Sequence, residues 1–206
     1  MLRVVSVLER GDVRFFWTPS VQPAGAREVV LAVQSLFAIL SPDRGAHRRL
    51  RIGKKRMPAS PRERFWARIE RVGSLDRALG GKLEPELYTT KTRGERFQPA
   101  ARPIAEGTYA FEGHGDHVHF RYDVEPLSFE DAPDDLAIAP HGDHVVLWKA
   151  PTGTRPTWSA AGDVATLDDE GTQIVLIGGD HEPGHPDRDP ADLGMSRLDR
   201  LLEPRE

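Results

Sequence analysis

An alternation of apolar and polar residues over residues 108–124 constrains the fold of this chain more than any other feature. Two segments of β character, residues 108–112 and 117–124, flank the turn sequence Gly-His-Gly-Asp at residues 113–116. A period of two is typical of a half-buried strand, and the short glycine-containing connection indicates an antiparallel hairpin. Residues of one parity are predicted to face the core: Tyr109, Phe111, Val118, Phe120, Tyr122 and Val124.

The opposite face of this hairpin carries candidate metal ligands. His117 and His119 stand two residues apart, so they project from one face with about 6–7 Å between their Cα atoms. Pairing places Glu112 opposite one of them. Because the chain has no cysteine, a metal must be held by histidine and carboxylate. Glu112, His117 and His119 are therefore a candidate site for a divalent metal such as zinc, with a position left for water; surface histidines without a ligand are the alternative.

The string His-Gly-Asp-His-Val occurs twice, at residues 114–118 and 141–145. Each copy precedes a predicted strand, and the Gly-Asp pair suits a turn whether or not it has a function. If the two strands pair in one sheet, the histidines of both copies gather at one edge and strengthen the metal hypothesis. These histidines are His114, His117, His141 and His144.

Two helices are predicted between the β-rich segments. Ser60, Pro61 and Glu63 fit the start of a helix over residues 61–72, in which Phe65 and Ile69 begin an apolar stripe. A second, short helix over residues 75–79 is expected to start at a serine cap and to stop at a pair of glycines. The sequence thus favours an α+β fold dominated by antiparallel hairpins, with one main helix packed on a sheet.

The remaining segments set the domain organisation. Residues 1–178 are expected to form one domain and residues 179–206 an acidic loop followed by a short C-terminal helix. The N-terminal apolar run is too short for a membrane span or a secretory signal, so a cytoplasmic protein without a membrane partner is expected. Six further ranges are predicted to contribute strands: residues 2–8 with 13–17 as a hairpin, 36–40 with 49–52, 144–148, and 173–177.

Charge is divided unevenly along the chain. Residues 1–122 hold 22 Lys and Arg against 13 Asp and Glu, a net +9, whereas residues 123–206 hold 6 against 19, a net −13. The densest basic stretch, residues 44–71, is a candidate contact surface for a polyanion or an acidic protein. Solvated or internally compensated charge is the alternative. The candidate anion-binding residues are Arg49, Arg51, Lys54, Lys55, Arg56, Arg64 and Arg68.

Three segments carry a resemblance to a known group of sequences. Residues 88–96, 106–110 and 114–122, read together, resemble a family of uncharacterised bacterial proteins to which no activity is attached. The resemblance covers roughly a third of the chain. It implies a bacterial, cytosolic origin and assigns no role to any residue.

These observations support three functions. The first is a non-enzymatic binding module, without a cofactor, that presents the basic surface to an anionic partner. The second is a metal-dependent hydrolase that uses Glu112, His117 and His119. The third is a structural subunit of an assembly, and the sequence does not decide the oligomeric state. Phosphate-loop, dinucleotide-binding and serine-hydrolase motifs are absent from the sequence.

Overall fold

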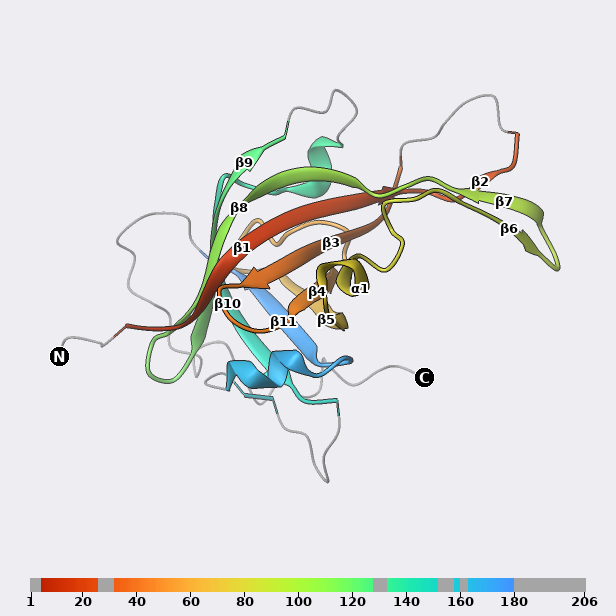
Figure 1. Ribbon diagram of the computed structural model, residues 1–206. Helices are drawn as coiled ribbons and strands as arrows, with labels where there is room; N and C mark the ends of the chain where they lie inside the picture. The colour runs from red at the N-terminus through yellow and green to blue at the C-terminus, as the bar shows by residue number, and fades with distance from the viewer. Residues whose placement is uncertain (1–4, 26–31, 128–132, 152–157, 160–162, 180–206) are drawn as a thin grey trace.

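Eight antiparallel strands close into a barrel in a computed structural model that describes residues 5–25, 32–127, 133–151, 158–159 and 163–179 (Figure 1). The order around the barrel is β1-β3-β4-β5-β11-β10-β9-β8. The strands are β1 (Ser6–Pro19), β3 (Val33–Pro42), β4 (His47–Ile52), β5 (Arg64–Gly73), β8 (Arg102–Gly113), β9 (Val118–Pro126), β10 (His141–Lys149) and β11 (Gln173–Gly178).

Two four-stranded meanders make up this barrel. The first runs through β1, β3, β4 and β5, and the second through β8, β9, β10 and β11. They join where β1 pairs with β8 and where β5 pairs with β11, in both cases antiparallel. Closure leaves no strand of the barrel with an unpaired edge. The chain is therefore a β-barrel protein, and the predicted α+β class is wrong.

Residues 61–72, predicted to form the main helix, lie mostly in strand β5. Side chains of β5 alternate along Arg64–Gly73: Phe65 and Ile69 are buried, whereas Trp66 is partly exposed. A spacing of four residues fits both a helical stripe and one face of a strand, so the pair Phe65 and Ile69 could not distinguish them. Pairing with β4 and β11 decides for the strand. The apparent capping signal is instead a turn, in which the amide of Glu63 donates to the carbonyl of Ser60.

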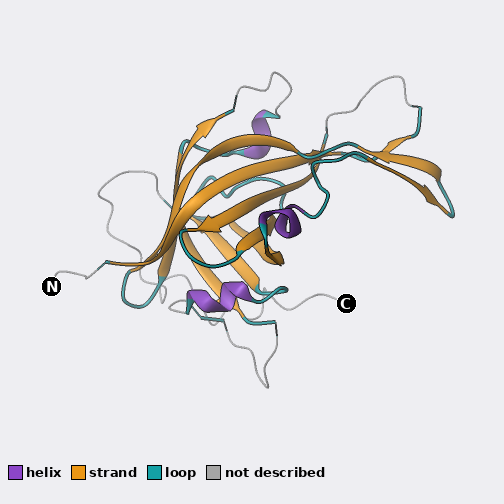
Figure 2. Cartoon of the chain, in the orientation of Figure 1, coloured by secondary structure: helices purple, strands orange, loops and turns teal. Residues whose placement is uncertain are grey.

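The short helix α1 (Leu75–Leu79) confirms the other helix prediction. The hydroxyl of Ser74 accepts a hydrogen bond from the amide of Arg77, and Gly80 ends the helix with a φ of 53°. The described helical elements are no longer than five residues (Figure 2): α1, η1 (Asp134–Leu136) and η2 (Val164–Asp168). Both 3-10 turns insert a leucine, Leu136 and Leu167, into the barrel core.

The interior of the barrel is filled by aromatic and aliphatic side chains. All six residues predicted to face inward from the 108–124 hairpin are buried, which confirms that prediction. Phe15 packs edge-on against Tyr122 with ring centroids 5.1 Å apart, and Phe111 lies 5.3 Å from Phe120. Rings packed in this way fill the space between the strands as a core.

The predicted hairpin of residues 2–8 and 13–17 is wrong for its described part, because β1 runs without a turn from Ser6 to Pro19. Gly11 explains this: a Cβ atom there would lie 2.1 Å from the carbonyl oxygen of Ser41, so the glycine permits close pairing with β3 rather than a turn. The other predicted strands lie within β3, β4, β10 and β11, as expected. Residues 180–206, including the expected C-terminal helix, lie outside the described residues.

A second sheet of three short strands extends from one end of the barrel (Figure 1). Its central strand, β7, pairs antiparallel with both neighbours. The sheet joins the barrel at two places along the chain: β1 is followed by β2, and β7 is followed by β8. Its strands are β2 (Gln22–Pro23), β6 (Glu86–Thr90) and β7 (Gly94–Gln98).

Candidate metal centre

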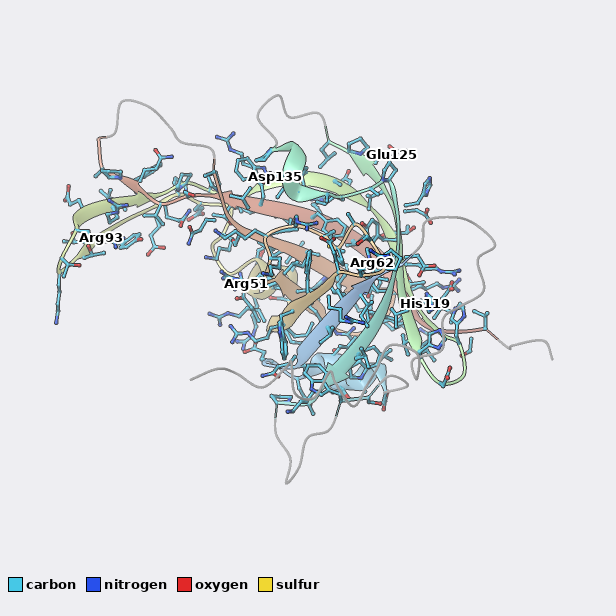
Figure 3. The ribbon with its side chains drawn as sticks, turned by 180° about the vertical axis from the view of Figure 1, so that it is seen from behind. Arg51, Arg62, Arg93, His119, Glu125 and Asp135 are labelled. Carbon is cyan, nitrogen blue, oxygen red and sulfur yellow. The ribbon has the colours of Figure 1, made fainter. Side chains whose placement is uncertain are left out.

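Three histidines meet at the end of the hairpin formed by β8 and β9. Pairing between these strands ends with Glu112 opposite His119 and Gly113 opposite Val118. The connecting turn is closed by a hydrogen bond from the amide of His114 to the carbonyl of His117, 2.8 Å long. This turn brings His114 and His117 next to His119, which Figure 3 labels.

The three imidazoles form a compact, buried cluster. The ring centroids of His114 and His119 lie 4.3 Å apart, those of His117 and His119 4.9 Å, and those of His114 and His117 5.5 Å. One ligand nitrogen from each ring lies within 4.8 Å of the others. Zinc–nitrogen bonds of about 2.0–2.1 Å in tetrahedral geometry need nitrogens about 3.4 Å apart. The three ligand nitrogens therefore lie near, but not yet at, the spacing that one shared ion requires.

Carboxylates are hydrogen-bonded to Nδ1 of two of the three rings. Nδ1 of His117 lies 2.8 Å from Oδ1 of Asp116, and Nδ1 of His119 lies 2.5 Å from Oδ1 of Asp143 on β10. Because an ionised carboxylate only accepts hydrogen bonds, each Nδ1 carries the proton and each Nε2 is left as the possible ligand atom. The Nε2 atom of His117 is buried and has no hydrogen-bond partner among the described residues.

Asp143 is itself held as an anion. Burial raises the pKa of this carboxyl group, but the hydrogen bond from His119 and the guanidinium of Arg121 offset that effect and leave the pKa below its usual range. Arg121 donates from Nε to Oδ2 of Asp143 over 3.0 Å. An ionised Asp143 keeps the His119 ring in one orientation and makes its other nitrogen more basic.

Glu112 lies beside the cluster. Its Oε2 atom is 3.7 Å from Nε2 of His114 and 3.0 Å from Nη1 of Arg121, and its side chain is mostly buried. Of the predicted set, the structure brings His117 and His119 together and places Glu112 at the margin of the same site. His114 is the third member of the compact group. Strand alternation does not predict this member, because a turn residue has no strand parity that gives the direction of its side chain.

The two copies of His-Gly-Asp-His-Val do not bring their histidines to one edge. His141 is exposed and pairs with Asp123 on β9. His144 points into the barrel, where its ring lies 5.7 Å from that of Tyr122. The second copy starts strand β10 itself, whereas the first forms a hairpin turn. The same string therefore occupies two different environments.

The candidate anion-binding residues lie on and beside β4 and β5, where several are already paired. Glu70 accepts ion pairs from Arg49 at 3.2 Å, Arg51 at 3.3 Å and Arg68 at 3.6 Å. Arg49 is buried and also donates to the carbonyl of Leu79. Arg56 pairs with Glu63, and Lys55 donates to the carbonyl of Val33. The last two candidates, Lys54 and Arg64, are exposed.

Comparison with known proteins adds no relative. No family model, curated protein or solved structure matches the chain. Within the described residues, no helix is long and apolar enough to cross a membrane.

Proposed function

We propose that this chain binds a divalent transition metal ion, zinc foremost, through His114, His117 and His119. One observation carries the proposal: the Nε2 atom of His117 is buried without a hydrogen-bond partner among the described residues, while its Nδ1 atom is held by Asp116. A buried polar nitrogen in this state costs free energy unless something binds it. A metal ion shared with the two neighbouring rings removes that cost.

Zinc suits these donors better than magnesium or calcium does. Neutral imidazole is a preferred ligand of zinc, copper, nickel and iron, whereas magnesium and calcium take oxygen ligands. The Asp–His pairs behind His117 and His119 match the carboxylate–histidine arrangement that fixes the ring tautomer at metal sites. Zinc is therefore the first ion to test.

The reaction class that such a centre supports is hydrolysis. A zinc ion held by His114, His117 and His119 would have a fourth ligand position open, and it would supply a water of lowered pKa. Glu112, whose Oε2 atom lies 3.7 Å from Nε2 of His114, would either accept a proton as a general base or serve as a fourth ligand. The role of Glu112 thus distinguishes two kinds of metal site. As a general base it would belong to a hydrolytic site, and as a fourth ligand it would complete a structural site.

Metal analysis of untagged protein tests the proposal. We expect one zinc ion per chain after dialysis against zinc and then against buffer. The double variant H117A/H119A should lose it, and the matched control H141A, which removes an exposed histidine paired with Asp123, should keep it. Substoichiometric zinc in the wild type, or equal zinc in all three proteins, would contradict the proposal.

A second proposal concerns the outer surface of β4 and β5, which we suggest binds an anionic partner without catalysis. The basic face is defined here as Arg51, Arg64, Arg68 and, on β10, Lys149. Glu70 is the single carboxylate that pairs with these cations among the described residues, and two arginines share it. Such an excess of positive charge favours a polyanion. Retention on heparin that falls steeply with salt is expected, and R64E/R68E should weaken it.

A further inference from the structure

An exposed tryptophan lies in the middle of the basic face. Trp66 lies two residues after Arg64 and two residues before Arg68 on β5. Because side chains alternate along a strand, all three project outward from the barrel. Trp66 is 36% exposed, whereas Trp17 and Trp148 are almost completely buried in the core. An outward tryptophan between two arginines is not required by the barrel core, which takes Ala67 and Ile69 from the same strand.

The surroundings of Trp66 hold its ring in place without covering it from β4. Its ring packs against that of Trp158, with centroids 5.3 Å apart and planes at 65°. Gly53, whose amide donates to the carbonyl of Trp66, has no side chain to lie over the ring on the β4 side. Arg51 stands opposite Arg68 on β4 and is labelled in Figure 3. The result is an aromatic surface bordered by cations.

From this arrangement we infer that the basic face binds single-stranded nucleic acid, with a base stacked on Trp66 and phosphates at Arg51, Arg64 and Arg68. Sequence-tolerant binding of single strands combines a cationic track with aromatic rings on which unpaired bases stack. A duplex keeps its bases stacked internally, and a sulfated glycan or an acidic protein offers charge without a planar base. The inference rests on the proposed anion-binding role of this face and names the class of anion.

Lys149 on β10 adds a cation next to Trp158. Its Nζ atom lies 5.8 Å from the centroid of the Trp158 ring, a cation–π contact. Val175, which stands opposite Trp66 on β11, is buried in an apolar cluster against which Trp158 packs. Cations therefore stand beside both tryptophans, as phosphate binding requires.

The test compares three probes on the full-length chain. Binding of an oligothymidylate of about 15 nucleotides, a duplex of the same length and heparin is measured by competition with a labelled oligothymidylate. We expect the single strand to bind more tightly than the duplex and to quench tryptophan fluorescence. W66A should raise the Kd for oligothymidylate by roughly 5- to 150-fold, the loss expected for one stacked base, and leave heparin binding unchanged.

Variants separate stacking from charge and from folding. W66F keeps a ring and should retain most of the affinity for the single strand. R64E/R68E should weaken oligothymidylate and heparin alike, whereas R93E, which changes an exposed arginine between β6 and β7, should weaken neither. Circular dichroism melting confirms that each variant folds.

The possible contrary results distinguish the two proposals for this face. The nucleic-acid assignment is contradicted if heparin binds but the single strand is not preferred, or if W66A does not change the Kd for oligothymidylate. In either case the proposed anion-binding role of the face is retained. Failure of all three probes to bind contradicts both.

Discussion

His119 on β9 donates a hydrogen bond from Nδ1 to Asp143 on β10, across two strands that pair directly. This contact joins the proposed metal centre to the barrel wall. It fixes which nitrogen of His119 carries the proton and ties the orientation of the ring to the pairing of two barrel strands. Metal affinity should therefore depend on a residue that does not itself bind the ion.

D143N is expected to weaken zinc binding about 10- to 100-fold, because an amide holds the His119 ring less firmly and makes it a poorer ligand. Competition with a chelator of known affinity measures the change. D123N is the matched control, since Asp123 pairs with His141 on the exposed surface of the barrel. An equal Kd for D143N and wild type would show that Asp143 does not support the site.

Zinc should stabilise the folded chain. A ligand that binds only the folded state contributes about 2.7 kcal/mol when its concentration is 100 times its Kd. Differential scanning calorimetry should therefore show a Tm several degrees higher with zinc than with a chelator, and H117A should abolish the shift. Magnesium should give no shift, because it disfavours imidazole ligands; a shift of equal size with magnesium would point to another kind of site.

Removing Arg48 should destabilise the fold more than removing a surface arginine. Its side chain is 2% exposed and pairs with Glu9 at 2.6 Å and with Asp168 at 2.8 Å. Tyr109 donates to the same Glu9, so R48A leaves a partly buried carboxylate without its cation. We expect a loss of about 3–5 kcal/mol in the free energy of unfolding in urea. R10A, which breaks an exposed pair with Asp43, should cost about 1 kcal/mol or less.

The pair of Glu63 and Arg56 should add a small pH-dependent stability. Hydrogen bonds from Arg56 and from the amide of Ala59 lower the pKa of Glu63 in the folded chain. A depressed carboxyl pKa stabilises the fold above the unfolded pKa of about 4.3, and this contribution is lost as the pH falls through the folded pKa. E63Q should therefore be less stable than wild type by about 1 kcal/mol or less at pH 7. Urea unfolding at lower pH should show the difference shrinking; a constant difference would exclude the pair as its source.

Local patterns predicted local structure in this chain. Alternation over residues 108–124 indicated the β8–β9 hairpin and the direction of its side chains, and the caps at Ser74 and Gly80 indicated α1. These signals succeed because the strand period and the cap hydrogen bonds involve residues close in sequence. The same alternation placed His117 and His119 in one region of the molecule.

Long-range pairing could not be predicted from these patterns. The strand state of residues 64–73 depends on pairing with β11, which follows far later in the chain. Closure of the barrel likewise depends on β1 meeting β8. His114 belongs to a turn that is closed by a hydrogen bond from its amide to the carbonyl of His117. The direction of its side chain depends on this turn and not on the alternation of a strand. In each case the missing information is a contact between segments and not a local preference.

Anomalous diffraction at the zinc edge tests the central claim most directly. A crystal grown with zinc should show an anomalous peak among the imidazoles of His114, His117 and His119, with zinc–nitrogen distances of about 2.0–2.1 Å. Zinc bound elsewhere on the chain, with these three rings left as they are, would contradict the proposed centre.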